Sequence, residues 1–350
     1  MKITFVMPTP NMSGGVRVCA IYAKKLTEMG HKVSIVTTKK NYLPFKSQLK
    51  RILKGRGWLS REAQTQNHFS NMGIPIQYGS TEKYLSDDDL PDADVVIATW
   101  WETAVWVNNL SLVKGKKFYF IQGIDYVNES VSREAVEATY QFNFQIITIA
   151  NWIKELLITR HGINNIPIIP NSVEHTIFYA SKRSIRAHAS IGFLFSEAEC
   201  KGVPVALQVI DELRLKLPKL AVFSFGSSVP QKITLPNYVS LTISPEQDEI
   251  RNIYQQCDVW LCCSLSEGFG LTLIEAMACG TPVEDIIEHN ENGFLCDIND
   301  VDNLVDSVMT LLNGGNVMWQ YFSLNAMTYA KSYSWDQAAQ KFESVLLESK

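Results

Sequence analysis

Short apolar runs alternate along this chain with longer stretches in which apolar residues recur at helical spacing. Residues 3–7 and 190–195 are runs of the length expected for a buried parallel strand. After the first run, Val18, Ile21 and Leu26 fall on one face of a helix. The alternation continues through both halves, which predicts an α/β protein with two doubly wound domains on parallel sheets.

The stretch from 259 to 282 has the clearest local pattern. An apolar run at 259–263 is broken at 264–270 by small residues and two glycines, and helical spacing then continues from Leu271 to a stop at Gly280 and Pro282. This predicts a strand, a glycine-bearing turn and a helix whose N-terminus opens beside the carboxyl end of the strand. Free backbone N–H groups and the helix dipole make such a turn suitable for binding an anion.

Two glutamates bracket this turn, with seven residues between them. Glu267 lies in the loop, where it can face a ligand. Glu275 lies in the first turns of the helix, where a side chain leans back toward the N-terminus. One acid can therefore contact a sugar and the other a ribose, while the amides between them hold phosphates. For Glu275 by itself, a solvated helix residue is the alternative.

Length and composition narrow the possible classes. A chain of 350 residues predicts two domains of ordinary size. Apolar content of 46% and charged content of 19% are typical of a well-packed protein, and a net charge of -4 argues against a nucleic-acid binder. No apolar run reaches transmembrane length, and the first residues predict a strand rather than a signal peptide. The seven cysteines lack zinc-site spacing, so we expect reduced thiols in a cytoplasmic protein.

The segment 266–282 resembles the E-x7-E signature of the retaining, nucleotide-sugar-dependent glycosyltransferases of family four, also called group 1. The resemblance covers nearly the whole chain and implies the GT-B fold, in which two Rossmann-like domains face each other across a cleft. Residues 166–174 resemble the hinge of the family. The implied division is an acceptor-side domain over 1–170, a nucleotide-sugar-binding domain over 171–332, and a helix in 333–350 that crosses back to the first domain.

The resemblance implies a function and a set of site residues. The family transfers a sugar, with retention of its anomeric configuration, from a nucleotide-diphosphate sugar to an acceptor hydroxyl, which suggests a role in cell-surface polysaccharide or glycan assembly. Glu267 and Lys201 would be catalytic. The implied donor-binding residues are Glu275, Gly268, Phe269, Gly270, Leu271, Thr272, Gly14, Gly15 and Ser244. For the pair at 14 and 15, a plain glycine turn is the alternative.

No metal or other cofactor is implied, because Lys201, the helix N-terminus and backbone amides would stabilise the developing diphosphate charge. Asp92 and Asp94 have the spacing of a metal-binding pair, but they precede their strand and so lie at the wrong edge of the sheet. We therefore predict no metal site. The expected small-molecule partner is a nucleotide sugar.

The acceptor side is predicted in the first half of the chain. Trp100 and Trp101 follow one predicted strand, and Gln122 and Asp125 follow the next. The tryptophans can stack on sugar rings, with core packing as the equal alternative. Residues 39–61 are basic and aromatic, so they can contact an anionic membrane surface or a glycan or lipid-linked acceptor. The alternative is a surface helix that packs its apolar face on its own domain, and a membrane contact would place the protein peripherally at the inner membrane face.

Three departures from the family pattern motivate another class of function. Phe193 stands where relatives carry an arginine that neutralises the diphosphate, and no histidine occurs between His68 and His161, where many relatives carry one. A glycine-bearing loop of relatives has no counterpart between Val283 and Glu284, either because the protein has lost it or because a segment is missing from the sequence at this point, which we favour. These departures are compatible with a non-catalytic, nucleotide-sugar-binding homologue. A sugar-nucleotide epimerase and a pyridoxal-dependent phosphorylase are further alternatives.

Overall fold

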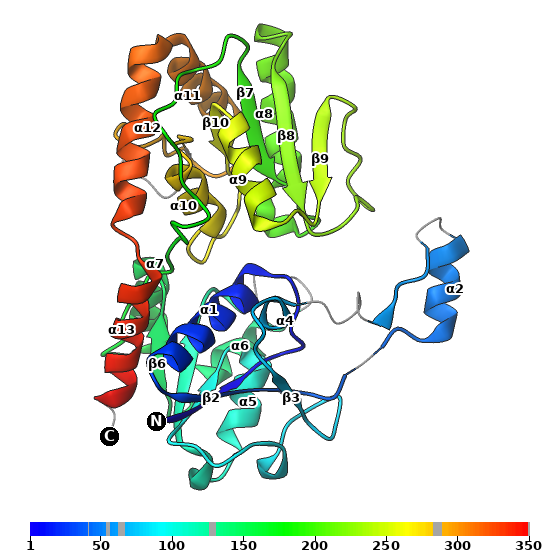
Figure 1. Ribbon diagram of the computed structural model, residues 1–350, viewed down its shortest axis with the longest axis vertical. Coiled ribbons are helices and arrows are strands. Elements are labelled where there is room, and N and C mark those ends of the chain that lie inside the picture. The colour runs from blue at the N-terminus through cyan, green and yellow to red at the C-terminus, as the bar shows by residue number, and fades with distance from the viewer. Residues whose placement is uncertain (41, 54–56, 62–66, 126–130, 283–288, 349–350) are drawn as a thin grey trace. The chain divides into compact units, whose positions relative to one another are not determined.

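The computed structural model describes residues 1–40, 42–53, 57–61, 67–125, 131–282 and 289–348. The chain folds into two compact units (Figure 1). Unit 1 consists of Met1–Pro170 with Ala339–Lys350, and unit 2 consists of Asn171–Ala338. Within the described residues, no helix is both long enough and apolar enough to cross a membrane.

Unit 1 is built on a parallel sheet with strand order β3-β2-β1-β4-β5-β6. Because all of these strands run the same way, the loops that follow β1, β4 and β5 gather at one edge, the carboxyl edge of the sheet. The elements of unit 1 before its C-terminal segment are β1 (Lys2–Val6), α1 (Gly14–Glu28), β2 (Lys32–Thr37), α2 (Phe45–Leu53), α4 (His68–Asn71), β3 (Ile76–Tyr78), η1 (Asp87–Asp89), β4 (Val95–Ala98), α5 (Trp101–Asn108), η2 (Leu112–Lys114), β5 (Lys116–Ile121), α6 (Arg133–Thr139), β6 (Gln145–Thr148) and α7 (Asn151–His161).

Helices cover both faces of this sheet, as neighbouring residues of β5 show. Successive side chains of a strand point to opposite faces. Phe120 meets Tyr22 of α1 edge to face at 5.6 Å and Phe342 of α13 at 5.2 Å between ring centroids. Tyr119, next in the chain, lies 6.3 Å from the ring of Tyr140, just after α6. The sheet is therefore doubly wound, as the alternating pattern predicts.

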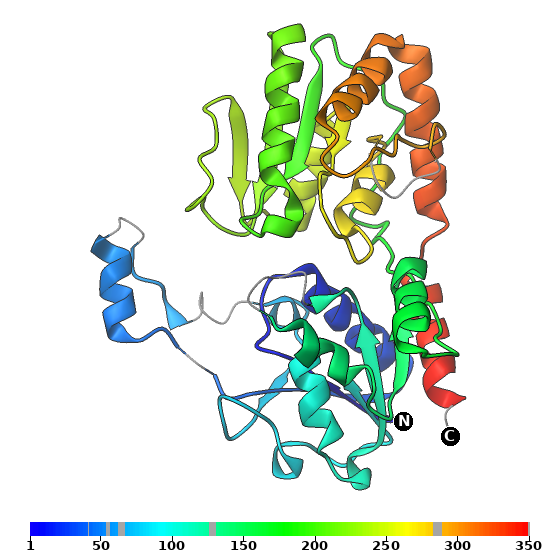
Figure 2. The same ribbon diagram turned by 180° about the vertical axis from the view of Figure 1, so that it is seen from behind.

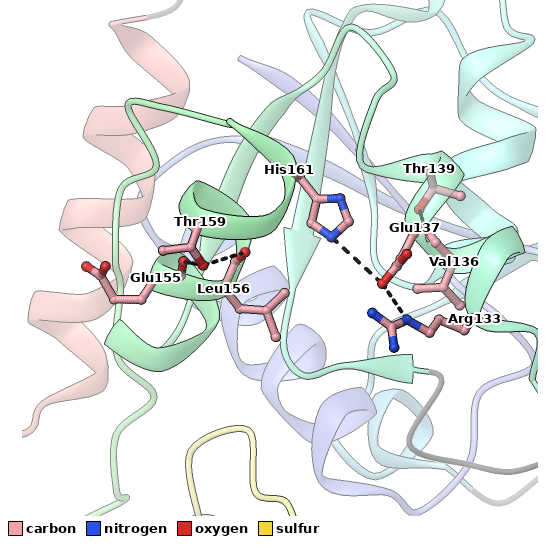
Figure 3. A network of polar contacts seen from close by, with 8 residues as sticks. All are labelled: Arg133, Val136, Glu137, Thr139, Glu155, Leu156, Thr159 and His161. Atoms are coloured by element: carbon pink, nitrogen blue, oxygen red, sulfur yellow. Dashed lines mark hydrogen bonds and ion pairs between the residues drawn. The ribbon is translucent and has the colours of Figure 1, made fainter.

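A small polar network joins α6 to α7 on unit 1. Arg133 Nε donates to Glu137 Oε1 at 2.7 Å, one turn further along α6. His161, the last residue of α7, brings Nε2 to 4.0 Å from the same carboxylate oxygen, so that Glu137 lies between the two bases (Figure 3). The His161 ring also packs against Tyr140 at 5.1 Å. This network holds the ends of two helices together beside β6.

Unit 2 is built on a second parallel sheet, with strand order β10-β7-β8-β9 among the described residues. The chain order of these strands gives the same winding as four neighbouring strands of unit 1. The elements that complete the chain are β7 (Ser190–Leu194), η4 (Glu199–Lys201), α8 (Val203–Lys216), β8 (Ala221–Gly226), β9 (Val239–Ile243), α9 (Gln247–Gln256), β10 (Val259–Leu261), α10 (Leu271–Ala278), α11 (Val301–Asn313), α12 (Gly315–Lys331) and α13 (Trp335–Leu347), the last of which continues from unit 2 into unit 1.

Two apolar clusters sandwich the unit 2 sheet. One gathers side chains of α8 and α11, the other those of α9 and α10, and α8 and α9 lie on opposite faces of the sheet in both views (Figures 1 and 2). Trp260 is fully buried in the second cluster. Gly192 on the neighbouring strand makes room for it, since a Cβ there would lie 2.5 Å from the Trp260 ring. A glycine in a strand interior is thus explained by close approach of a large ring.

Arg183 fixes the ends of α9 and α10 relative to each other. Its guanidinium donates to the carbonyl oxygens of Gln255 and Cys257, at the end of α9, and to Cys279 O and Thr281 Oγ1, just after α10. These four bonds use the fork geometry that only arginine offers. As a result α10, which carries the central segment of the sequence, is held in register with the sheet.

Candidate active site

The turns after β7 and β10 meet at the carboxyl edge of the unit 2 sheet. Leu265 N donates to Cys200 O at 2.8 Å, which ties the two turns together. A Cβ at Gly202 would lie 1.8 Å from Cys263 O, and Gly202 has a φ of +60°. Only glycine fits both the space and the left-handed conformation. This close approach places the preceding residue, Lys201, directly over the turn that leads to α10.

Lys201 and Glu267 form a hydrogen-bonded ion pair at this edge. The Lys201 Nζ atom lies 2.7 Å from Glu267 Oε1, and their side chains are 27% and 18% exposed. Ser264 Oγ donates to the same carboxylate oxygen at 2.7 Å. Burial alone would lower the pKa of Lys201, but the Glu267 carboxylate outweighs it and holds that pKa above its ordinary value. The site therefore has a fixed positive charge beside a half-buried acid.

A pocket surrounds this ion pair. Besides Lys201 and Glu267, it is lined by Ser264 and by Thr272 in the first turn of α10, with Phe193 and Leu194 among the apolar walls. Its free volume of about 10 Å³ is close to that of one water molecule. Gly270, at φ +79°, immediately precedes α10 at this point. The pocket thus combines an ammonium, a carboxylate and the N-terminal end of a helix, which together suit a phosphate-bearing ligand.

Glu275 lies apart from this ion pair. It is 3% exposed and faces α9, where Tyr254 Oη donates to its Oε2 at 3.1 Å. Tyr254 itself is fully buried. Glu275 is not among the residues that line the pocket around Lys201 and Glu267. The ribose contact assigned to Glu275 stays a prediction, and Tyr254 becomes the residue that orients its carboxylate.

We expect Tyr254→Phe to raise the KM for the sugar donor about fivefold and to leave kcat nearly unchanged. The variant keeps the buried ring, which packs on Trp260 at 4.6 Å, but removes one hydrogen bond to a carboxylate, a loss of about 1 kcal/mol. Steady-state kinetics with varied donor would measure the effect. Tyr238→Phe, which removes a hydroxyl bonded to Asp211, is the matched control. An equal change in both variants would reject a specific role for Tyr254.

The other predicted donor-binding residues of unit 2 lie in different environments. Phe269 packs its ring edge to face against Tyr333 at 5.6 Å and joins the apolar cluster of α9 and α10. Ser244 has a φ of +49°, and its hydroxyl donates to Ser227 O at 3.1 Å. Gly268 and Leu271 stand in and just after the turn before α10. Donor contacts by these residues remain predictions.

The glycine pair of unit 1 begins α1 at the carboxyl edge of the first sheet. Ser13 precedes the helix and Gly14 is its first residue. Gln122, just after β5, donates from Nε2 to Gly15 O at 3.3 Å and approaches Cys19 Sγ at the same distance. The structure therefore brings together Gly15 and Gln122, which the sequence placed on different sides of the reaction.

A second pair at this edge joins the two other predicted acceptor-side groups. Trp101 N, at the start of α5, donates to Asp125 Oδ2 at 3.0 Å. Trp100 and Trp101 are both partly exposed, so neither is a core side chain. Burial, opposed by the Trp101 hydrogen bond and assisted by the nearby charge of Glu102, raises the pKa of Asp125 to about 7. A carboxyl group that titrates near neutrality therefore lies beside two partly exposed indoles.

We expect Asp125→Asn to stabilise unit 1 at pH 8 and to change its stability little at pH 4. Because the pKa of Asp125 is about 7 in the folded protein and near 4 in the unfolded chain, the folded state binds this proton more tightly. The stability that the group contributes is present below pH 4 and is lost as the pH rises through 7. Asparagine keeps the bond from Trp101 and has no charge to bury. Allowing for partial exposure, we expect a gain of about 2 kcal/mol at pH 8.

Urea unfolding at the two pH values, followed by tryptophan fluorescence, measures this difference. The same gain at both pH values would show that the charge of Asp125 is not its cause.

The structure also bears on metals and on the departures from the family pattern. Among the residues that the structure describes, no cluster of three or more His, Cys, Asp or Glu is placed to hold a metal ion. Asp94, from the pair for which a metal site was not predicted, accepts from Lys2 N at 2.7 Å at the amino-terminal edge of the sheet.

Phe193, which stands where relatives carry an arginine, is 1% exposed and belongs to a core cluster. The junction between Val283 and Glu284 lies outside the described residues.

Comparison with known families bears directly on the pocket just described. A family model described as "Glycosyl transferases group 1" matches residues 197–330, which include Lys201, Glu267 and Glu275. The part of the chain that carries these three residues therefore resembles the group 1 glycosyltransferases.

The chain is similar to proteins from several organisms. It is 26% identical over 221 residues to an uncharacterized glycosyltransferase of Haemophilus influenzae, with 58% of this chain and 61% of that protein aligned. It is 29% identical over 167 residues to the D-inositol 3-phosphate glycosyltransferase of Corynebacterium diphtheriae, with 41% of this chain and 39% of that protein aligned. The chain thus spans less than two thirds of the length of these curated relatives.

Solved structures show the fold of this chain. Anabaena Alr3699/HepE, in complex with UDP and glucose, superposes with a TM-score of 0.73 at 17% identity, over 99% of this chain and 100% of that one. A likeness at this level of identity carries the fold alone. The GT-B fold expected from the sequence is confirmed.

Sequence reasoning missed two residues of the site. Ser264 shares the carboxylate oxygen of Glu267 with Lys201, and Tyr254 holds Glu275. A hydroxyl three residues before an acid in a tight turn is a local signal that could have indicated Ser264. For Tyr254 no such signal exists, because its partner lies 21 residues away and only the packing of α9 on α10 joins them.

Proposed function

We propose that this protein is a group 1 glycosyltransferase that moves a sugar from a nucleotide-diphosphate sugar to an acceptor hydroxyl, with retention of the anomeric configuration. The observation that carries the proposal is the Lys201–Glu267 pair in a pocket at the N-terminal end of α10. A pyrophosphate needs a fixed cation and free N–H groups, and a sugar needs a charged acceptor for its hydroxyls. Both needs are met where the turns after β7 and β10 meet.

In this mechanism the acceptor oxygen attacks the anomeric carbon on the face from which the diphosphate departs. The bond from that carbon to the diphosphate oxygen breaks, and the proton of the acceptor hydroxyl passes to the departing oxygen. Lys201 and the backbone amides at the start of α10 stabilise the charge that develops there, as an oxyanion hole does. Glu267 holds the hydroxyls of the transferred sugar, and Glu275 those of the ribose.

Donor binding would change the partners of Lys201. In the free protein its ammonium is neutralised by Glu267 at 2.7 Å, and the space around the pair holds about one water molecule. A diphosphate carries more negative charge than one carboxylate and would take over the ammonium. Glu267, still held by Ser264, would then be free to accept hydrogen bonds from the sugar.

One structural neighbour and one relative suggest the substrate classes. HepE of Anabaena is described in complex with UDP and glucose, and the Corynebacterium protein is named for D-inositol 3-phosphate. For this chain we propose a nucleotide sugar as donor and a glycan or a lipid-linked hydroxyl compound as acceptor. A role in polysaccharide or glycan assembly follows from that acceptor class.

A thermal-shift panel of nucleoside diphosphates tests donor binding before the acceptor is known. We expect one of UDP, GDP or ADP to raise the melting temperature clearly more than its monophosphate, and the corresponding sugar nucleotide to be consumed when a mixture of glycan acceptors is added. Release of an altered sugar nucleotide without acceptor would favour an epimerase. Binding without turnover would favour a non-catalytic homologue. A pyridoxal absorbance would favour a phosphorylase, and no shift with any nucleotide would overturn the proposal.

A further inference from the structure

The segment after β2 forms a small unit of its own, built from α2 and residues 57–60. Gln48, in the middle of α2, is 2% exposed and makes two hydrogen bonds to the backbone of Leu59. Its Nε2 donates to Leu59 O at 2.8 Å, and Leu59 N donates to its Oε1 at 3.1 Å. The rings of Phe45 and Trp58 meet at 5.8 Å. The Gln48 side chain therefore holds the backbone of Leu59 against α2.

This arrangement turns the apolar side of α2 outward. The apolar side chains at positions 45, 49, 52 and 53 have the spacing of a single helix face, which in a globular domain normally packs on the core. Here they are solvent-exposed together with Trp58. The α2 surface, as we define it, consists of Phe45 (67% exposed), Leu49 (42%), Ile52 (47%), Leu53 (86%) and Trp58 (55%). The alternative in which α2 packs its apolar face on its own domain is wrong.

The charge of this region differs from that of the rest of the chain. Residues 39–61 contain eight Lys or Arg and no Asp or Glu. Because the whole chain has a net charge of -4, the remaining residues carry a net charge of -12. Lys46 and Lys50 are exposed on α2 beside the α2 surface. Apolar side chains and positive charge are thus concentrated in one short helix of an otherwise acidic protein.

We propose that the α2 surface docks on an anionic lipid bilayer. A helix with this combination lies in the interface of a membrane, with Leu and Ile side chains below the headgroups, Trp at their level and Lys side chains against anionic lipids. Charge complementarity decides the occupant. A second copy of the chain would bring two basic helices together, and a nucleic acid would leave Leu53 and Ile52 without an apolar partner.

The α2 helix is connected to the edge of unit 1 that carries the predicted acceptor-side residues. The helix follows β2 and therefore branches from the carboxyl edge of the unit 1 sheet, where Gly15, Gln122, Asp125 and Trp101 lie. A bilayer bound by α2 would hold that edge near the lipid headgroups. The docking itself does not depend on sugar transfer, because it is measured without donor or acceptor.

Vesicle co-sedimentation tests the proposal directly. We expect the full chain to pellet with phosphatidylcholine vesicles that contain phosphatidylglycerol and to stay in solution with phosphatidylcholine alone. Each basic residue near an anionic surface contributes about a fivefold change in partitioning, so Lys46→Gln with Lys50→Gln should weaken binding about thirtyfold. Leu53→Ser, which removes an apolar side chain from the interface, should weaken it about tenfold.

Matched controls separate these effects from general surface changes. Leu215→Ser replaces another leucine that is 78% exposed, in α8 of unit 2, and Lys216→Gln with Lys219→Gln removes two exposed lysines there. Both controls should bind vesicles like the wild type. The proposal is overturned if the wild type does not pellet with anionic vesicles, or if the α2 variants pellet as the wild type does. It is equally overturned if Leu53→Ser instead abolishes self-association or binding to a nucleic-acid probe while vesicle binding is absent.

Discussion

Lys201→Met lowers the kcat of sugar transfer by a factor of about 10² to 10³, which is the cost expected when one preorganised charge is removed from a leaving-group site. The reason lies in the pKa of Lys201, which the Glu267 carboxylate holds above its ordinary value, so that the ammonium is charged at any physiological pH. Methionine fills similar space but offers neither charge nor hydrogen bond. Turnover with saturating donor measures the change.

Lys216→Met is the control for this prediction, since it removes an exposed lysine from the last turn of α8 in the same unit. It should transfer sugar like the wild type. If Lys201→Met kept wild-type turnover while binding donor normally, the ammonium would have no part in stabilising the departing diphosphate, and the mechanism would need another cation.

Glu267→Ala lowers kcat about a hundredfold, while Glu275→Ala mainly raises the KM for the donor. Glu267 lies in the pocket with Lys201, and we propose that its contact to the reacting sugar strengthens in the transition state. Glu275 is proposed to hold the ribose, which does not react, so its contribution of about 1.5–3 kcal/mol appears in binding. Initial rates over a range of donor concentrations separate the two effects.

The exposed Glu199, two residues before Lys201, supplies the matched control. Glu199→Ala should leave both kinetic constants unchanged. Should Glu267→Ala and Glu275→Ala both behave like the wild type, the paired acids are structural and the proposed roles are wrong. If the effects are exchanged, so that Glu275→Ala lowers kcat, the two acids have been assigned to the wrong parts of the donor.

Local pattern was enough to predict the elements that form the pocket. The apolar run at 259–263, the break with two glycines and the helical spacing from Leu271 correspond to β10, the turn and α10, whose first residue is Leu271. The reason is that strand length, glycine and helix periodicity are properties of neighbouring residues. The doubly wound α/β fold follows from the same alternation and is confirmed.

Contacts between distant residues could not be predicted in this way. Phe269 stands in the turn beside Glu267, and its predicted donor contact stays a prediction, but its packing on Tyr333, 64 positions further along the chain, has no local signal. The hydrogen bond from Tyr254 to Glu275 and the exposure of the apolar side of α2 likewise depend on how residues far apart in the sequence pack. Periodicity shows that a helix has an apolar face but not what that face meets.

The most direct test of the central claim is the affinity of the full chain for UDP, or for whichever nucleoside diphosphate gives the largest thermal shift, measured by calorimetry for the wild type and for Lys201→Met. The claim is that the Lys201–Glu267 pocket of unit 2 receives the diphosphate of an activated sugar. It predicts that the diphosphate binds the wild type well and binds Lys201→Met at least about tenfold more weakly, because a charge-assisted contact is lost. Equal dissociation constants for the two proteins would contradict it.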